Sequence, residues 1–272
     1  MKGPRLAAAY EYEVLEWGCD TEAGRLYGKL YLPLGGAGQR PLMVFAHELG
    51  STHRSGAHYA EALAGRGVAA YLFDFRGGGK ASKSPGKTTG MTVLTETEDL
   101  LAVLKAARGW PFVDPARVFV FGASQGGLVA TLAAKQRPEW LCALALFYPA
   151  FIIPTALHQQ FESLADVPEA FDYMGWINVG RDYVSTLWDL DPYDGMEDFT
   201  KPVLLLHGDQ DRIVPPQYSL RAADCYPRID LYILRGVGHG FYSESFQEAM
   251  RRILPWLKKN GLLPEERPQV KA

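Results

Sequence analysis

Two kinds of segment alternate along the chain. Short runs rich in valine, leucine and phenylalanine, such as Leu42–Phe45 and Val118–Phe121, are typical of strands buried in a sheet. Between them lie longer stretches with helical periodicity, such as Thr92–Ala107. Because strands that alternate with helices build a parallel sheet covered on both faces, the pattern predicts an α/β fold.

The pattern predicts eight strands and five helices in one domain that spans residues 1–272, with no repeat or low-complexity tract. Tyr10–Leu15 and Arg25–Leu32 resemble an antiparallel pair that opens the sheet. The remaining strands are expected near Leu42, Val68, Val118, Ala143, Val203 and Leu231, and the helices over Gly56–Gly65, Thr92–Ala107, Gly126–Gln136, Tyr218–Tyr226 and Phe246–Lys259.

One segment, residues 150–198, departs from this alternation and lies between the sixth and seventh predicted strands. We expect it to form a small cap over the active site. Each aromatic side chain buries about 150–250 Å² and either grips an apolar acyl group or fastens the cap to the sheet, and the second role suits most of them. The aromatic residues of the segment are Phe161, Phe171, Tyr173, Trp176, Tyr183, Trp188 and Tyr193.

The stretch Gly122–Gly126, which reads Gly-Ala-Ser-Gln-Gly, follows a predicted strand and precedes a predicted helix. A serine on such a sharp strand-to-helix turn needs small residues two positions before and after it, and its hydroxyl then projects over the sheet edge. Ser124 is therefore the candidate nucleophile.

A serine nucleophile of this kind predicts an acid and then a histidine, each after a later strand. The apolar run Val203–Leu206 leads into a loop that holds Asp211, and Leu231–Leu234 leads into a loop that holds His239. The chain order is therefore serine, aspartate, histidine.

These motifs resemble those of the α/β-hydrolase family of serine hydrolases, in which the acid lies in a loop reading HGxxDxxVP and the histidine in a loop reading GxxHxF. The resemblance runs from about Leu30 to Leu257, apart from the inserted segment. It implies the α/β-hydrolase fold, a catalytic triad of Ser124, Asp211 and His239, and no cofactor. Within the family, Gly90–Asp99, Ala123–Gly127 and Asp198–Val203 are most similar to bacterial cinnamoyl (feruloyl) esterases.

Other acids and histidines compete for the triad positions. Asp209 shares the loop of Asp211, and we expect its side chain to cap the turn. His207 ends a strand and is expected to be a packed, hydrogen-bonded histidine, whereas the role of His158 in the inserted segment stays open.

An acyl-transfer site also needs two backbone N–H groups directed at the developing oxyanion. One is expected from Gln125, directly after the nucleophile. The other is expected from Leu49, in the loop where the family has His-Gly and this chain has His47-Glu48. Because a carboxylate in the oxyanion hole would oppose the charge that forms there, we expect Glu48 to face away from the site.

Substrate contacts are expected from the inserted segment. In cinnamoyl esterases a cap tyrosine followed by a Pro-hydrophobic-Tyr-like stretch contacts the phenolic end of the substrate, and Tyr183 with Pro192–Asp194 approximates that arrangement. Trp176 and Tyr173 are the other candidates to bind substrate.

Metal and phosphate sites are not expected. The residue four positions beyond His47 is Ser51, so His47 and Glu48 do not begin a zinc-binding HExxH motif. The stretch Gly77–Lys80 lacks the spacing of a phosphate-binding loop, because Asp74 stands where the first glycine belongs.

Composition and charge fit a globular enzyme. The chain has 272 residues, of which 47% are hydrophobic and 22% charged, and its net charge of −3 argues against nucleic-acid binding. The run Leu6–Tyr10 is too short for the core of a signal peptide, and no stretch approaches the ~20 apolar residues of a membrane span. The three cysteines, Cys19, Cys142 and Cys225, are expected to be buried thiols. These features predict a cytoplasmic protein with no nucleic-acid or membrane partner, and they do not fix its oligomeric state.

The sequence therefore predicts a serine carboxylic ester hydrolase that forms an acyl-enzyme on small esters, with hydroxycinnamoyl esters as the most specific expectation. A serine aminopeptidase-like hydrolase is the first alternative, although only about forty residues precede the third strand and peptidases of this fold generally carry a large additional domain. A binding protein that has lost the chemistry is the second alternative, because fold alone does not establish function.

Overall fold

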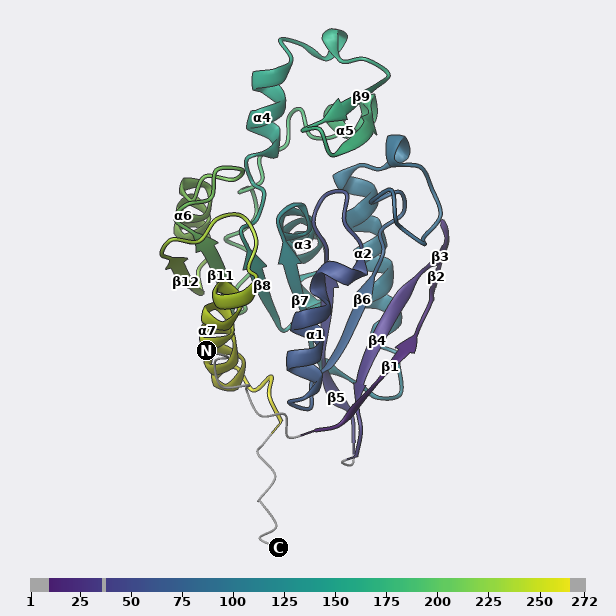
Figure 1. Cartoon of the computed structure of the whole chain (residues 1–272), viewed down its shortest axis with the longest axis vertical. Coiled ribbons are helices and arrows are strands. Elements are labelled where there is room, and N and C mark those ends of the chain that lie inside the picture. The colour runs from purple at the N-terminus through teal and green to yellow at the C-terminus, as the bar shows by residue number, and fades with distance from the viewer. Residues whose placement is uncertain (1–9, 36–37, 265–272) are drawn as a thin grey trace, which may run out of the picture.

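A computed structural model of the protein describes residues 10–35 and 38–264, so residues 6–9 of the amino-terminal apolar run lie outside the described part. Its centre is an eight-stranded sheet in the order β1-β4-β6-β5-β7-β8-β11-β12 (Figure 1). The predicted α/β-hydrolase architecture is confirmed. The strands are β1 (Tyr12–Glu16), β4 (Gly28–Pro33), β5 (Arg40–Ala46), β6 (Ala69–Phe73), β7 (Val113–Ala123), β8 (Ala143–Phe147), β11 (Val203–Gly208) and β12 (Ile229–Leu234).

The sheet is parallel from β6 to β12 and antiparallel at its amino-terminal edge. Strand β1 pairs with β4 in the register Tyr12↔Pro33, and β4 in turn pairs antiparallel with β6. The expected opening pair is therefore confirmed. Residues 25–26 differ from the prediction, because they belong to a separate hairpin of β2 (Cys19–Thr21) and β3 (Gly24–Leu26).

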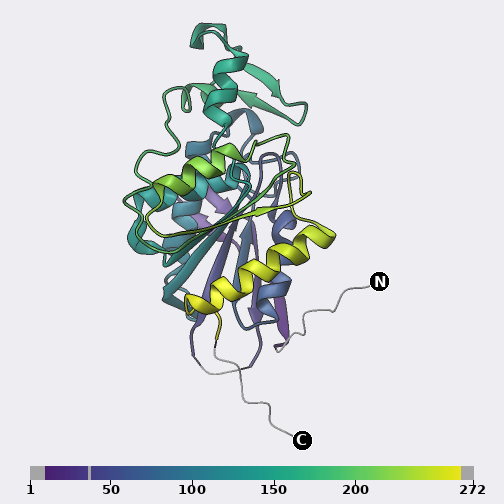
Figure 2. The ribbon, with the colours of Figure 1, turned by 90° about the vertical axis from the view of Figure 1, so that its left-hand side faces the viewer.

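Helices cover both faces of the sheet (Figure 2). Successive strand residues point to opposite faces. Leu42 and Val44 of β5 accordingly join the core under α2, α3 and α6, whereas Met43 and Phe45 join the core under α1 and α7. The helices that cover the sheet are α1 (Ala57–Ala64), α2 (Val93–Ala107), α3 (Gln125–Gln136), α6 (Gln217–Cys225) and α7 (Ser243–Lys259), with short 3-10 turns η1 (His53–Gly56), η2 (Thr88–Gly90) and η3 (Pro138–Trp140).

The segment between β8 and β11 stands at the end of the sheet where the parallel strands finish (Figures 1 and 2). It packs onto the main core through Ile177 and Tyr183, and at Gly180 a side-chain Cβ would lie 2.1 Å from the carbonyl oxygen of Thr89. The segment is therefore fastened to the loop before α2. Its elements are α4 (Ile153–Gln160), η4 (Leu164–Asp166), β9 (Ala170–Tyr173), β10 (Ile177–Gly180) and α5 (Arg181–Ser185).

The three cysteines are free thiols, of which Cys19 is buried and Cys142 and Cys225 are half-buried rather than fully buried. Burial raises the pKa of the Cys19 and Cys142 thiols to about 11. None of the described helices combines the length and the apolar character that crossing a bilayer requires.

Candidate active site

The turn between β7 and α3 holds Ser124 in a strained conformation. The serine has φ 51° and ψ −120°, a region that non-glycine residues rarely adopt. Glycine is required beside it, because a Cβ at Gly126 would lie 2.1 Å from the carbonyl oxygen of Ala46, and one at Gly122 would lie 2.5 Å from that of Gly126. The absence of these side chains lets α3 begin directly against the end of β5.

Three loops at this edge of the sheet bring the predicted triad residues together. The Nε2 of His239 lies 3.0 Å from the Oγ of Ser124, and its Nδ1 lies 2.7 Å from the Oδ2 of Asp211. Because the carboxylate accepts the proton on Nδ1, Nε2 is left to accept the proton of the serine hydroxyl. This arrangement is the one a serine nucleophile and its general base require.

The Asp211 carboxylate is held by several donors. Its Oδ1 accepts hydrogen bonds from the backbone N–H groups of Ile213 and Val214, both at 2.9 Å. Burial opposes ionisation, but hydrogen bonds from His207, His239 and Val214 lower the pKa of Asp211 well below its usual range. The carboxylate is therefore charged throughout the physiological range of pH and can stabilise a histidinium at position 239.

His207 is buried and hydrogen-bonded, as predicted. Its Nε2 lies 2.8 Å from the carbonyl oxygen of Val214 and 3.2 Å from the Asp211 Oδ2, and its Nδ1 lies 2.6 Å from the Ser219 hydroxyl. Since two acceptors face Nε2 of His207, that nitrogen carries the proton, and Nδ1 accepts a hydrogen bond from the Ser219 hydroxyl.

Asp209 and His158 lie outside this arrangement. Asp209 accepts a 2.7 Å hydrogen bond from the backbone N–H of Gly236, so it caps the loop after β12 rather than the turn of its own loop. The Nε2 of His158 lies 2.8 Å from the carbonyl oxygen of Trp188, within the inserted segment.

The two predicted oxyanion donors lie on adjacent loops. Gln125 begins α3, and the first N–H groups of a helix have no partner within it. Leu49 follows β5 and lines the same cavity as Ser124. In the described part of the chain, neither N–H donates to a backbone carbonyl outside its own element, and the assignment of both to an oxyanion hole stays a prediction.

The side chain of Gln125 is fixed on both sides. Its Nε2 donates to Glu96 Oε2 at 2.8 Å, and its Oε1 accepts from the Tyr183 hydroxyl at 2.8 Å. Burial raises the pKa of Glu96 well above its usual value, although the hydrogen bond from Gln125 opposes that shift. The residue after the nucleophile is thus tied to α2 and to α5.

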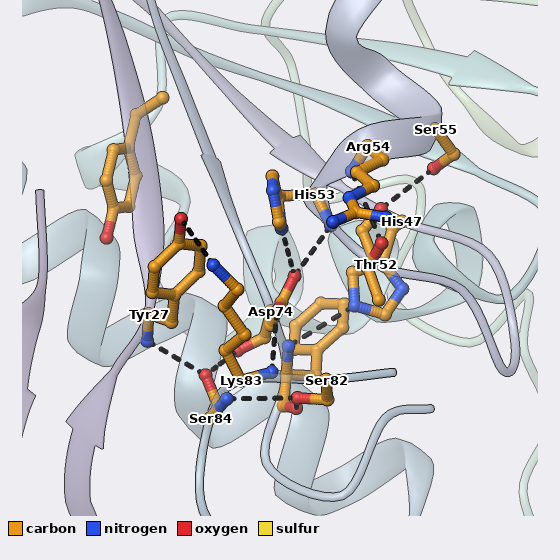
Figure 3. Close-up of polar contacts among 12 residues, drawn as sticks. Tyr27, His47, Thr52, His53, Arg54, Ser55, Asp74, Ser82, Lys83 and Ser84 are labelled. Atoms are coloured by element: carbon orange, nitrogen blue, oxygen red, sulfur yellow. Dashed lines mark hydrogen bonds and ion pairs between the residues drawn. The ribbon is translucent and has the colours of Figure 1, made fainter. Parts of the chain in front are cut away.

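A buried network holds the loop that carries Leu49 (Figure 3). Asp74, at the end of β6, accepts hydrogen bonds from the backbone N–H and the Nδ1 of His53, both at 2.7 Å, and from the backbone N–H of Lys83 at 2.8 Å. The Ser84 hydroxyl donates to the backbone carbonyl of Asp74 and accepts from the backbone N–H of Tyr27, which joins the residue before β4 to the network. The loops after β5 and β6 are therefore fixed to each other.

His47 also supports the loop that carries Leu49. Its Nε2 accepts a 3.2 Å hydrogen bond from the N–H of Phe75, and its Nδ1 lies 2.8 Å from the carbonyl oxygen of Glu48. Burial lowers the pKa of His47, so the imidazole is neutral and carries its proton on Nδ1.

The expectation that Glu48 faces away from the site is wrong. Glu48 lines a cavity of about 230 Å³ beside Ser124 and His239, and its Oε1 accepts a 3.1 Å hydrogen bond from the hydroxyl of Tyr148. The physical reason is the phenol, because it offers the carboxylate a hydrogen-bond donor inside the wall of the site. The cavity is lined by Glu48, Leu49, Ser51, Ser55, Ser124, Tyr148, Trp176, His239, Gly240 and Tyr242.

Of the three residues of the inserted segment predicted to bind substrate, Trp176 alone lines this cavity. Tyr183 is fully buried behind Gln125, and Tyr173 packs against the Tyr183 ring with centroids 5.4 Å apart. The hydroxyl of Tyr183 is therefore occupied within the protein.

Two cavity residues, Tyr148 and Tyr242, were not anticipated from the sequence. The ring of Tyr148 packs edge-on against the His239 ring, with the two centroids 4.7 Å apart. The backbone of Tyr148 has a φ of 40°. Tyr148 directly follows β8, the strand that pairs with β7, and this position could have indicated that it lies beside Ser124. Tyr242 follows His239 by three residues and is 61% exposed.

No cluster of three or more histidine, cysteine, aspartate or glutamate side chains within residues 10–35 and 38–264 is arranged to hold a metal ion. The chemistry that the described side chains offer is nucleophilic acyl transfer.

Several known proteins are similar to this chain in sequence or in structure. The profile of the prolyl oligopeptidase family matches residues 54–261. An uncharacterized protein of Mycobacterium tuberculosis is 31% identical over 229 residues, which cover 81% of this chain and 70% of that protein. The quorum-quenching protein AidA of Acinetobacter baumannii is 25% identical over 264 residues, covering 80% of this chain and 86% of AidA.

Among solved structures, Est1E of Butyrivibrio proteoclasticus with bound ferulic acid superimposes with a TM-score of 0.81 at 26% identity. The match covers 90% of this chain and 98% of Est1E.

Proposed function

Because the chain belongs to the prolyl oligopeptidase family and is a serine hydrolase of the α/β-hydrolase fold, we propose that it hydrolyses small carboxylic esters through an acyl-enzyme. The observation that carries this proposal is the hydrogen-bonded series from Ser124 through His239 to Asp211 at the wall of a cavity. A cavity of about 230 Å³ suits a small substrate.

In the proposed reaction, His239 accepts the Ser124 proton while the serine oxygen attacks the ester carbonyl. Asp211 keeps the imidazole in the required tautomer and stabilises its cationic form. The N–H groups of Leu49 and Gln125 stabilise the oxyanion. His239 then protonates the departing alcohol, and water repeats the sequence to release the acid.

Hydroxycinnamoyl esters are the proposed acyl class. Two features support this choice: the similarity to Est1E, a structure of which holds ferulic acid, and Trp176 at the cavity, which offers a flat surface to an aromatic ring. Cleavage of an aminoacyl amide is a second candidate, because the matching family is that of prolyl oligopeptidase.

A substrate panel separates these activities. The proposal predicts turnover of p-nitrophenyl butyrate and methyl ferulate, a higher kcat/KM on methyl ferulate than on methyl butyrate, and none on alanine p-nitroanilide. Turnover of the anilide alone would favour the peptidase. A preference for methyl butyrate would contradict the hydroxycinnamoyl assignment without affecting the esterase assignment.

A further inference from the structure

The wall of the cavity beside Ser124 includes an acidic side chain, that of Glu48, with no basic partner among the described residues. Glu48 Oε1 accepts a hydrogen bond from the Tyr148 hydroxyl, and Glu48 Oε2 is buried with no hydrogen-bond partner among the described residues. None of the residues that line the cavity is a lysine or an arginine. Within the described residues, the carboxyl group of Glu48 therefore has no cationic partner.

The groups that face Glu48 from the neighbouring elements are neutral. Burial raises the pKa of Tyr59, Tyr148 and Tyr242, and the charge of Glu48 raises them further, so all three keep their protons at neutral pH. Burial lowers the pKa of His58, which is therefore uncharged under the same conditions. Glu48 is thus close enough to raise the pKa of both cavity tyrosines, Tyr148 and Tyr242.

Aromatic rings accompany this carboxylate. Tyr148, Trp176 and Tyr242 line the cavity, and the latter two are 45% and 61% exposed. The faces of tyrosine and tryptophan rings attract cations, and quaternary ammonium groups are commonly recognised by such aromatic surroundings. A carboxylate and several aromatic rings in one cavity are the groups that an ammonium ion requires.

These groups lie on the histidine side of the site. The Tyr148 ring contacts the His239 ring, and Gly240 and Tyr242 follow His239 in the chain. Because the histidine protonates the departing alcohol, the alcohol part of the ester occupies this side during catalysis. A positive charge there would also offset the repulsion between Glu48 and the developing oxyanion.

We propose that Glu48, with Tyr148 and Tyr242, forms an ammonium-binding subsite for the alcohol part of the substrate, so that the enzyme prefers esters of amino alcohols of the choline type. This inference rests on the proposed esterase function and adds to it the chemical class of the alcohol.

The test compares two substrates that differ only in charge. Butyrylcholine and 3,3-dimethylbutyl butyrate have the same shape, and the second has carbon in place of the quaternary nitrogen. We expect kcat/KM of the wild-type enzyme to be about tenfold or more higher for the choline ester, a factor that corresponds to about 1.4 kcal/mol. The Glu48→Gln substitution is expected to lower this ratio several-fold, and the aromatic rings that remain account for any residual preference.

The ratio is measured on one enzyme sample, so partial misfolding of a variant cancels. Glu244→Gln is the matched control, because it removes the same charge from an exposed position close in the chain to Tyr242. It should keep the wild-type ratio.

Equal rates on the two esters in the wild-type enzyme would overturn the subsite and leave the esterase proposal standing. A high ratio that persists in Glu48→Gln would also overturn it. If the enzyme hydrolysed none of the four esters, namely butyrylcholine, 3,3-dimethylbutyl butyrate, methyl ferulate and p-nitrophenyl butyrate, the proposed function and the subsite would both be overturned.

Discussion

The hydroxyl of Tyr183 donates a 2.8 Å hydrogen bond to the side-chain oxygen of Gln125, the residue that follows the candidate nucleophile. Tyr183 belongs to α5 in the inserted segment, whereas Gln125 is the first residue of α3. The inserted segment therefore reaches the nucleophile turn from behind, in addition to supplying Trp176 to the cavity. This contact gives the segment a means of positioning the Gln125 N–H.

Replacing Tyr183 with phenylalanine should lower kcat several-fold and change KM less, because the orientation of the Gln125 N–H matters most for the oxyanion of the transition state. The buried Gln125 oxygen would also lose its donor, which costs about 1–3 kcal/mol of stability. Steady-state kinetics and urea unfolding measure the two effects. Tyr173→Phe, which removes a hydroxyl from the adjacent ring, should leave kcat unchanged, and equal losses in both variants would argue against the positioning role.

Asp211→Asn should reduce kcat on p-nitrophenyl butyrate by about 10⁴-fold, since an amide does not hold His239 in the required tautomer. Asp209→Asn is the matched control from the same loop, and its side chain bonds the Gly236 N–H instead. It should cause a far smaller loss. The reverse order of effects would mean that the wrong aspartate has been assigned to the triad.

Much of the fold follows from the sequence, because the buried strands are apolar throughout and the helices have clear periodicity. The β2–β3 and β9–β10 hairpins were not predicted, since strands of three or four residues carry too little pattern to distinguish them from loops. Ser124, Asp211 and His239 could be selected because each follows a strand in a characteristic motif.

The orientation of side chains in the site was harder to predict. The direction of Glu48 depends on Tyr148, which is 100 positions away in the chain and meets it only in the folded protein. Tyr183 was expected at the substrate, yet its hydroxyl bonds Gln125. Both cases depend on long-range hydrogen bonds, for which local sequence carries no signal.

The raised pKa of Glu96 predicts a pH-dependent stability. Burial keeps this carboxyl protonated in the folded protein above the pKa of about 4.3 that it has when unfolded. The folded state then binds more protons than the unfolded state, so stability falls as pH rises through this window, by at most about 1.4 kcal/mol per pH unit. Glu96→Gln removes the titrating group and retains an oxygen that accepts from Gln125.

The stability of Glu96→Gln relative to wild type should therefore increase from pH 4.5 to pH 8, as measured by urea unfolding. Glu98→Gln, at a position 69% exposed on the same helix, should show no such trend. A difference between Glu96→Gln and wild type that stays constant with pH would contradict the assignment.

Asp74→Asn should weaken both stability and catalysis. The amide nitrogen does not accept the Lys83 N–H, so a partly buried donor loses its partner at a cost of about 1 kcal/mol. The loop that carries Leu49 would also lose part of its support, which should lower kcat/KM. Asp114→Asn is the control, because Asp114 also accepts a backbone N–H and forms an ion pair, in its case with Arg117, but lies at the start of β7 and outside these loops. It should leave kcat/KM unchanged. Wild-type stability and kcat/KM in Asp74→Asn would show that the network does not hold the loop.

The central claim, that Ser124 is the nucleophile, is tested most directly by labelling with a fluorophosphonate followed by peptide mass mapping. Ser51 and Ser55 line the same cavity, so the mapped position distinguishes among three serines. We predict a single label on Ser124, retained in Ser51→Ala and Ser55→Ala and abolished in Ser124→Ala. An unlabelled wild-type protein, or a label on either of the other serines, would contradict the account.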